Sequence, residues 1–282
     1  AGTINTLIDP GIFPPVDQPP AYSPESLYCD EISFKNYPGV EEQDVTGQEM
    51  QSHLDKGHLR AFDSYEGLAA FLKGKPHLNK IGLIVKTRNV VTKARTILDT
   101  KESGVKWVTT KSQRVTLPRL LDAVLRMQFL LSLASGAKDS VKAFVLDFPD
   151  AFWQITICEE EQRFFCATAT IKGKRKYLVC MRAAQGSSNA PTLWGRVAAL
   201  IMRLSQALYS RDEVNLQSYV DYPIAALRGT SDEQMTQAAT LILAWEALGF
   251  GLAYSEGQLG STVTWIGGTI SAEADGSRAR VK

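Results

Sequence analysis

The sequence contains few of the residues that build disulfide frameworks and metal centres. Its 282 residues include four cysteines and three histidines. No pair of cysteines has Cys-x-x-Cys spacing, so we expect reduced thiols in an intracellular protein, with a disulfide framework as the alternative. The histidines all lie in the N-terminal quarter, and we expect ordinary surface side chains there rather than a zinc site. These residues are Cys29, Cys158, Cys166, Cys180, His53, His58 and His77.

Long apolar runs are also missing. No stretch approaches the roughly 20 residues that a membrane-spanning helix requires, so no membrane partner is expected. The N-terminal Ala-Gly-Thr-Ile-Asn has no basic region followed by an apolar segment, which argues against a signal peptide. The missing initiator Met suggests a fragment of a longer polypeptide. A hydrophobic content of 44% and a charged content of 22% are typical of a globular protein with one large or two small domains.

The net charge is only +1, but its distribution is uneven. Residues 1–79 hold 5 Lys and Arg against 12 Asp and Glu, whereas residues 80–126 hold 11 against 3. A basic block inside a nearly neutral protein favours contact with phosphates, and a solvated basic surface is the alternative.

The pattern of apolar residues predicts an α+β protein. Residues 1–60 are rich in proline and acids and are expected to form an irregular leader. A short helix follows at 63–73, then a hairpin of strands 81–86 and 90–98. From Leu117 onward we expect a helix at 117–135, the strand before Asp147, a hairpin at 164–182, a helix at 191–209, a strand through Asp221, a helix at 233–248 and a strand at 263–270. This order indicates helices packed on one face of a mainly antiparallel sheet.

Two acidic residues stand at informative places in this pattern. The apolar run Ala143-Phe144-Val145-Leu146 ends abruptly in Asp147, and an unpaired carboxylate at the end of a buried strand is costly to desolvate. The segment Leu216–Pro223 also reads as a strand and carries Asp221. If the two strands are neighbours, the carboxylates can meet and share a divalent metal ion.

Four segments, in this order and spacing, resemble the fingers and palm of a reverse transcriptase of the retroviral and long-terminal-repeat retrotransposon type. A fingers strand carrying a triphosphate-binding Arg is matched by Thr92–Asp99, motif A by Leu146–Trp153, motif B by Ala184–Pro191, and the Tyr-x-Asp-Asp box by Tyr219–Tyr222. Motif D and the primer grip have counterparts in Leu248–Phe250 and Trp265–Gly268. The resemblance covers about residues 80–270.

The resemblance implies a right-hand polymerase with a site for two Mg²⁺ ions, a primed RNA or DNA template and deoxynucleoside triphosphates. It makes Asp147 and Asp221 the catalytic metal ligands, since Mg²⁺ prefers hard oxygen donors. It places fingers at 61–111 and 154–185, a palm at 112–153 and 186–270, and the start of a truncated thumb or a linker at 271–282. The implied nucleotide-binding residues are Lys86, Arg88, Arg95, Asp150, Ala151, Phe152, Gln185 and Gly186. The implied primer grip is Trp265, Ile266, Gly267 and Gly268.

These residues have individual roles in the implied site. The guanidinium of Arg95 clamps the triphosphate, helped by Lys86 or Arg88, between which the spacing does not decide. The main-chain amides of Asp150 and Ala151 cradle the same group. Phe152 excludes a ribose 2′-hydroxyl. The alternatives, in which these residues have only a structural role, are a turn cap for Asp150, an Arg95–Asp99 ion pair, a simple turn at Gln185-Gly186, and a core position for Phe152 or Trp153.

Two positions depart from the family pattern. The second acid of the Tyr-x-Asp-Asp box is Tyr222, and a phenol is a poor Mg²⁺ ligand at neutral pH. The Lys that the family often places nine residues before the primer-grip Trp is Glu256. We therefore expect weakened metal binding and impaired turnover. The alternatives are a non-catalytic nucleic-acid-binding module and an inactive structural remnant.

Overall fold

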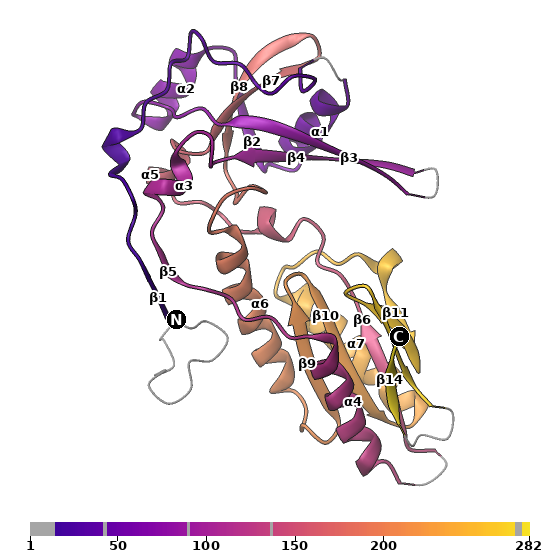
Figure 1. Ribbon diagram of the computed structural model, residues 1–282. Coiled ribbons are helices and arrows are strands. Elements are labelled where there is room, and N and C mark those ends of the chain that lie inside the picture. Colours follow the sequence, from indigo (N-terminus) through magenta and orange to yellow (C-terminus); the bar gives the residue numbers. More distant parts are fainter. Residues whose placement is uncertain (1–14, 42–43, 89–90, 136–137, 274–277) are drawn as a thin grey trace. The chain divides into compact units, whose positions relative to one another are not determined.

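The computed structural model of the chain describes residues 15–41, 44–88, 91–135, 138–273 and 278–282 (Figure 1). The described chain separates into two compact units. The hairpin unit comprises residues 15–113 and 152–193, and the sheet unit comprises residues 114–151 and 194–282. Among the described residues, no helix is both long enough and apolar enough to cross a membrane.

The hairpin unit combines short helices with antiparallel strands. β2, β8 and β7 form one three-stranded sheet in that order, while β3–β4 and β1–β5 are two-stranded. The elements are β1 (Pro15–Gln18), η1 (Pro24–Ser26), α1 (Asp44–Asp55), β2 (Leu59–Phe62), α2 (Tyr65–Leu72), β3 (Lys80–Arg88), β4 (Val91–Asp99), α3 (Val105–Val108), β5 (Lys111–Gln113), α5 (Glu159–Gln162), β7 (Cys166–Ile171) and β8 (Lys174–Cys180).

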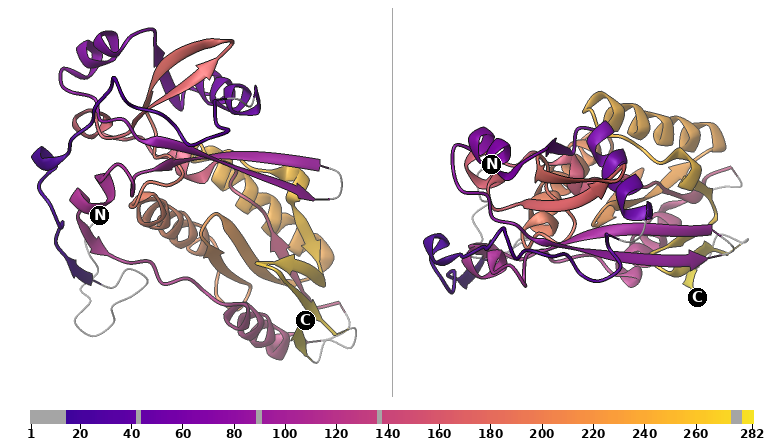
Figure 2. Two further views of the ribbon diagram at one scale, coloured as in Figure 1. Left: turned by 45° about the horizontal axis from the view of Figure 1, so that its top comes forward. Right: turned by 90° about the horizontal axis from the view of Figure 1, so that it is seen from above.

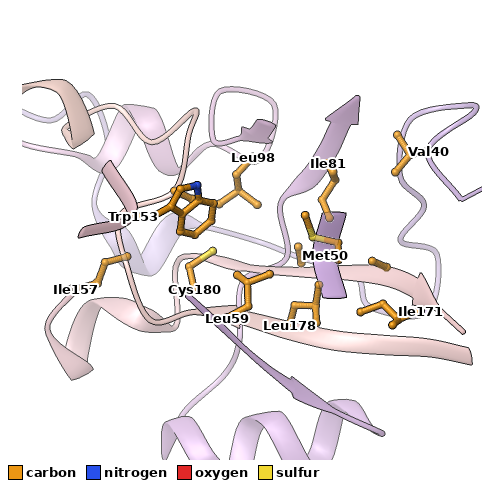
Figure 3. Packing of buried hydrophobic residues seen from close by; sticks show 13 residues of the cluster. Val40, Met50, Leu59, Ile81, Leu98, Trp153, Ile157, Ile171, Leu178 and Cys180 are labelled. Atoms are coloured by element: carbon orange, nitrogen blue, oxygen red, sulfur yellow. The ribbon is translucent and has the colours of Figure 1, made fainter. Parts of the chain in front are cut away.

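The core of the hairpin unit gathers apolar side chains from segments far apart in the sequence (Figure 3). Met50 of α1, Leu98 of β4 and Trp153 all belong to it. The helix α1 corrects the expectation of an irregular leader through residue 60. Its buried face includes Thr46, Gly47 and Met50, and such small or polar residues leave little apolar periodicity in the sequence.

The surroundings of the histidines and cysteines in this unit also depend on how its core is packed. His53 and His77 are buried, so the expectation of surface histidines is wrong for both. The His53 ring lies against Trp153 with centroids 4.4 Å apart, and its Nδ1 is 3.0 Å from Nδ1 of His58. All four cysteines are free, as expected.

The strands β3 and β4 run side by side as a long two-stranded ribbon (Figure 2). Their register pairs Lys80 with Asp99 at the base and Arg88 with Val91 near the tip. The sequence predicted this hairpin, and its turn at Asn89 lies outside the described residues. The helix expected at 63–73 is confirmed as α2, and the Ser64 hydroxyl caps it by accepting the Gly67 N–H at 3.1 Å.

The sheet unit is built on a four-stranded antiparallel sheet in the order β11-β6-β10-β9. A second antiparallel sheet has the order β12-β13-β14. The elements are α4 (Leu120–Leu133), β6 (Ser140–Val145), α6 (Ala190–Gln206, which begins in the hairpin unit), β9 (Val214–Tyr219), β10 (Tyr222–Gly229), α7 (Ser231–Ala247), η3 (Tyr254–Glu256), β11 (Gln258–Gly260), β12 (Thr262–Trp265), β13 (Gly268–Ala272) and β14 (Ala279–Val281).

Helices cover both faces of the four-stranded sheet, which corrects the expectation that they pack on one face (Figure 1). Successive side chains of a strand point to opposite faces. Val145 and Ala143 of β6 pack with α4, whereas Phe144 between them stacks on Trp245 of α7 with ring centroids 6.1 Å apart. Amphipathic spacing predicted both helices but carried no information about which face each one covers.

The apolar stripes that helical spacing predicts are only partly buried, with Val124 of α4 and Ile201 of α6 buried as predicted. The predicted stripes are Leu121, Val124, Leu125, Phe129 and Leu133 on α4, and Leu193, Val197, Leu200, Ile201, Leu204 and Leu208 on α6. On α4, Leu121, Leu125 and Phe129 are exposed, while Ala123, Met127 and Leu130 are among the residues that face the sheet. On α6, Leu200 and Leu204 are likewise exposed. Each helix carries apolar residues on more than one side, so spacing alone did not identify the buried side.

Several strand boundaries differ from the sequence-based expectation. The strand expected through Asp221 is a hairpin, with β9 and β10 on either side of a turn. The strand expected at 263–270 is likewise the hairpin β12–β13. The segment 271–282, expected as a linker or the start of a thumb, contains β14, which pairs with β13. The three-residue strand β11 was not predicted, because it is too short to show alternation.

Candidate active site

Asp221 lies in the two-residue turn of the β9–β10 hairpin. Tyr219 and Tyr222 close this turn as a pair, and Val220 has a φ of 56°. The left-handed region is unfavourable for a β-branched residue, so the surrounding structure must enforce it. Two hydrogen bonds hold the Val220 carbonyl, one from Nε1 of Trp194 at 2.9 Å and one from the Ser218 hydroxyl at 3.1 Å. The turn therefore presents Asp221 in a fixed backbone conformation.

The end of strand β6 lies directly against this turn. The Phe148 N–H donates to the Asp221 carbonyl at 2.9 Å, and the Leu146 N–H donates to the Pro223 carbonyl at 3.4 Å. Asp147 lies between these two bonds in the sequence, and its own carbonyl accepts the Ala253 N–H at 3.0 Å. The structure thus brings the segments of both predicted metal ligands together. The meeting of the two carboxylates on one ion stays a prediction.

Tyr222, which replaces the second acid of the family box, is held beside these residues. Nε2 of Gln258 donates to its hydroxyl at 3.2 Å. Partial burial raises the pKa of the Tyr222 phenol, and the negative charges of Asp147 and Glu256 add to the rise, while the Gln258 hydrogen bond opposes it. The phenol therefore keeps its proton at neutral pH and supplies no anionic oxygen to a cation.

The donor set of this site consists of carboxylates that suit Mg²⁺, but it is small. Carboxylate oxygens are hard ligands, and Asp147 and Asp221, the predicted ligands, carry such oxygens. In the described part of the chain, no three His, Cys, Asp or Glu side chains are grouped so that they could hold a metal ion. Glu256, at the end of η3, therefore does not complete such a group, although its charge reaches Tyr222.

The predicted primer grip forms the turn between β12 and β13. Ile266 and Gly267 are its two central residues, with φ values of 40° and 88°. Trp265 is fully buried, and its Nε1 donates to the Tyr222 carbonyl at 2.9 Å. Gly268 is packed so closely that a Cβ there would lie 2.7 Å from Cδ1 of Leu120. The Trp265 side chain therefore supports the Asp221 hairpin, and the turn exposes Gly267 rather than an aromatic ring.

The segment after Asp147 divides its side chains between solvent and core. Asp150 is exposed and has a φ of 53°, and Ala151 opens the single turn η2 (Ala151–Gln154). Phe152 is partly buried, whereas Trp153 belongs to the core of the hairpin unit. The prediction that one of the two aromatic residues is core is thus confirmed for Trp153. The triphosphate and sugar contacts of Asp150, Ala151 and Phe152 stay predictions.

Within the hairpin unit, the Gln185-Gly186 segment lies against strand β4. The Gln185 carbonyl accepts the Leu98 N–H at 2.9 Å, and the Gly186 carbonyl accepts the Thr100 hydroxyl at 2.9 Å. Gly186 has a φ of 98°, and a Cβ at this position would lie 2.1 Å from the Leu98 carbonyl oxygen. Only glycine fits this contact. The nucleotide contact of Gln185 and Gly186 stays a prediction.

The predicted phosphate-binding cations belong to the β3–β4 ribbon. The Arg95 side chain is exposed, and Arg95 pairs with Ile84 across the ribbon. Among the described residues, no ion pair joins Arg95 and Asp99. Asp99 instead accepts from the Tyr37 hydroxyl at 2.7 Å and from the backbone N–H groups of Lys101 and Glu102.

Lys86 and Arg88 both lie on β3, and their side chains are outside the described residues.

Sequence reasoning missed a cavity on the base of this ribbon. It has a volume of about 550 Å³ and lies between the ribbon, Gly186 and the chain after β4. Tyr37, Lys101, Lys106 and Lys111 contribute to its wall. The basic block at 80–126 was the available signal, but nothing in the sequence indicated that these lysines share a concave surface with Tyr37.

Comparison with known proteins identifies the fold. No family model and no curated protein matches the sequence. Among solved structures, a foamy viral protease–reverse transcriptase in complex with double-stranded DNA superposes with a TM-score of 0.60 at 16% identity. The match covers 92% of this chain and 39% of that chain. At this identity the likeness concerns the fold alone, and the chain has a reverse-transcriptase-like fold.

Proposed function

We propose that this chain is a reverse-transcriptase-like part of a retroelement polyprotein that binds a primed template and whose DNA synthesis is impaired. The observation that carries the proposal is the hydrogen bond from the Phe148 N–H to the Asp221 carbonyl at 2.9 Å. It joins the end of β6 to the β9–β10 turn, where the acids of a two-metal polymerase site belong. The reverse-transcriptase-like fold supports the same conclusion.

In this proposal, Asp147 and Asp221 hold Mg²⁺. When bound there, the ions would supply Lewis-acid chemistry for phosphoryl transfer to a primer 3′-hydroxyl and would neutralise charge on the pyrophosphate. Arg95 binds the triphosphate of a deoxynucleotide, and the Ile266-Gly267 turn supports the primer end. Gln185 and Gly186 line the nucleotide-binding pocket. Because Gly186 has no Cβ, the Gln185-Gly186 segment can approach β4 closely.

Impairment follows from two side chains of the same site. Tyr222 retains its proton, because burial and the charges of Asp147 and Glu256 raise its pKa, so it does not replace the missing carboxylate. By the resemblance, Glu256 stands at the position of a cationic proton donor to the departing pyrophosphate, and a carboxylate is unsuited to that role. The first change removes a ligand for Mg²⁺, and the second opposes the negative charge that develops on the leaving group.

A primer-extension assay with Mg²⁺ and all four deoxynucleotides tests this proposal. The natural chain should extend a primer slowly or not at all, and Tyr222→Asp combined with Glu256→Lys should raise the rate by at least about tenfold. Tyr222→Phe serves as the matched control, because it leaves the carboxylate count unchanged. Robust extension by the natural chain, or no gain in the double variant with intact primer–template binding, contradicts the impairment.

A second function, nucleic-acid binding without catalysis, is favoured by the lysine-lined cavity of the hairpin unit. This alternative predicts primer–template affinity that falls steeply as salt rises, because bound phosphates release counterions. It also predicts that the double variant binds as the natural chain does but still fails to extend the primer. A chain that binds neither nucleic acid nor nucleotides would be an inactive remnant.

A further inference from the structure

Two helices of the sheet unit, α6 and α7, each carry a row of exposed apolar side chains. On α6 and the turn that ends it, Leu200, Leu204 and Leu208 are 50%, 47% and 51% exposed. On α7, Met235 and Leu243 are 60% and 68% exposed. Single exposed apolar side chains are common on protein surfaces, but rows of them on adjoining helices indicate a surface that another protein covers.

The row on α6 points away from the sheet. The side-chain amide of Gln206 bonds to strand β9, donating to the Val214 carbonyl at 2.8 Å and accepting the Leu216 N–H at 3.1 Å. Successive residues of a helix are turned by about 100°, so Leu204 and Leu208, two residues before and after Gln206, lie on the opposite side of the helix.

The row on α7 also points away from the sheet. Leu241 is fully buried, and Trp245 of the same helix stacks on Phe144 of β6. The exposed residues Ala239 and Leu243 stand two positions before and after Leu241, so they lie on the opposite side of α7. Both helices therefore present an apolar row on their outer side.

The helices α6 and α7 are antiparallel neighbours. Nε1 of Trp245 on α7 donates to the Ser205 hydroxyl of α6 at 2.8 Å. Just beyond the end of α6, the Tyr209 hydroxyl donates to the Gln237 carbonyl of α7 at 3.5 Å. Contacts further along α6 thus involve earlier residues of α7, which defines antiparallel packing. The two apolar rows therefore lie side by side.

The charged residues of the two helices have opposite signs. The helix α6 contains Arg196 and Arg203 and no acid, whereas α7 contains Asp232, Glu233 and Glu246 and no Lys or Arg. Within the described ranges, neither Arg203 nor Glu246 forms an ion pair. An apolar partner surface that complements both helices must therefore be acidic opposite α6 and basic opposite α7.

A second copy of the chain carries such a surface. A twofold axis parallel to the helices and midway between them places α6 of each copy on α7 of the other. All neighbouring helices are then antiparallel, as in an up-down four-helix bundle. We propose that two copies of the chain associate through α6 and α7 in this arrangement. The inference does not depend on the proposed function, because none of these side chains has a role in it.

The heights of the charged residues along the helices agree with this arrangement. Rotation about an axis parallel to the helices leaves every residue at its own height. The bond between Ser205 and Trp245 marks one height that the two helices share. Arg203 precedes Ser205 by two residues, and Glu246 follows Trp245 by one. Arg203 of each copy therefore comes level with Glu246 of the other copy, where opposite charges attract.

The size of the contact sets the concentration at which the dimer should form. Each 17-residue helix is about 25 Å long and about 10 Å wide, so two helices cover about 500 Å². Association buries about 1,000 Å² over the two copies, which is less than a standard stable interface. We therefore expect a reversible dimer with a Kd in the micromolar range.

Sedimentation equilibrium of the full chain tests the association. From about 1 to 200 μM, the weight-average mass of the natural chain should rise from that of a monomer toward that of a dimer. Leu204→Glu and Leu243→Glu should each weaken the dimer at least about tenfold, because each places two charges in an apolar contact. A natural chain that stays monomeric at the highest concentration overturns the proposal and leaves the two rows to a different protein.

Leu125→Glu on α4 is the matched control. Leu125 is 57% exposed, and α4 covers the other face of the four-stranded sheet. This variant should dimerise as the natural chain does. Equal weakening by Leu125→Glu and Leu204→Glu refutes the assignment to α6 and α7. Far-ultraviolet circular dichroism shows whether each variant is folded, and Leu243→Glu gives the test independently if Leu204→Glu is not.

Charge reversal tests the pairing of α6 with α7. Arg203→Glu and Glu246→Arg should each weaken the dimer about fivefold, because like charges then meet twice in the contact. Tyr254→Phe removes only the hydrogen bond that Glu246 accepts at 2.8 Å and should leave the dimer unchanged.

A mixture of the two charge variants provides the sharpest result. A dimer of one Arg203→Glu chain and one Glu246→Arg chain has opposite charges at both contacts, so an equimolar mixture should associate as strongly as the natural chain. This recovery requires two different copies and cannot arise from pairing within one chain. If the mixture associates no better than either variant alone, the proposed arrangement is wrong, even where the natural chain dimerises.

Discussion

Gly186→Ala should destabilise the hairpin unit more than any ordinary glycine substitution. The φ of 98° already disfavours alanine, at a cost of about 1–2 kcal/mol. The new Cβ would also lie 2.1 Å from the Leu98 carbonyl oxygen, which is backbone and cannot rotate away. The segment must therefore move from β4 and give up the hydrogen bonds from Leu98 N–H and the Thr100 hydroxyl, each contributing about 1 kcal/mol.

Together these effects predict a loss of about 3–4 kcal/mol, a large part of the stability of a typical domain. Urea unfolding followed by circular dichroism measures it. Gly173→Ala is the matched control, because Gly173 has a φ of 74° but no heavy atom within 4 Å of the position of an added Cβ. The control should lose only about 1–2 kcal/mol. Equal losses in the two variants would refute the argument that the Leu98 contact requires glycine.

Three further predictions concern the candidate site and its surroundings. Val220→Gly should leave stability unchanged or raise it by up to about 1 kcal/mol, because glycine removes the strain at a φ of 56°; a loss above about 1 kcal/mol in urea unfolding contradicts this. Trp265→Phe should cost about 2–4 kcal/mol in the same measurement, because it leaves the Tyr222 carbonyl without its indole donor and opens space in the core; no loss shows that the bond is dispensable. The Asp99 hydrogen bond raises the pKa of Tyr37 to about 12, so absorbance titration should show this phenol ionising near that pH, and Asp99→Asn should return its pKa toward 10. Because the folded pKa is the higher one, the stabilisation is fully present below pH 10 and is lost as the pH rises through about 12; ionisation near pH 10 in the natural chain refutes the coupling.

Much of the secondary structure could be predicted because its signals are local. The apolar run that ends at Asp147 indicated β6, and a helix cap at Asp63 or Ser64, which the structure places at Ser64, indicated α2. Helix α1 was missed because the residues that it buries include Thr46 and Gly47, which carry no apolar signal. The hairpin at Asp221 was read as one strand, since Val220 is an unusual residue for a turn.

The candidate site could be predicted from the sequence only in part. Motif spacing suggested that Asp147 and Asp221 belong to neighbouring strands, and the bond from Phe148 to Asp221 agrees with that proximity. The hydrogen bond from Gln258 to the Tyr222 hydroxyl could not be predicted from the sequence. Gln258 belongs to β11, which is only three residues long and pairs with β6 only in the folded chain. The burial of Trp265, which turns its indole toward the Tyr222 carbonyl, also required the packed structure.

The sequence by itself determined the types of the longer periodic elements, the two acidic positions and the substitution of Tyr222, since these depend on residue identity and short-range spacing. The tertiary structure decided which helix sides are buried, which sheet face each helix covers, and that Tyr37 and three lysines share one cavity. These properties depend on contacts between segments that are distant along the chain. Helical and strand periodicity describe which residues lie on the same side of one element, but they do not specify the neighbour against which that side packs.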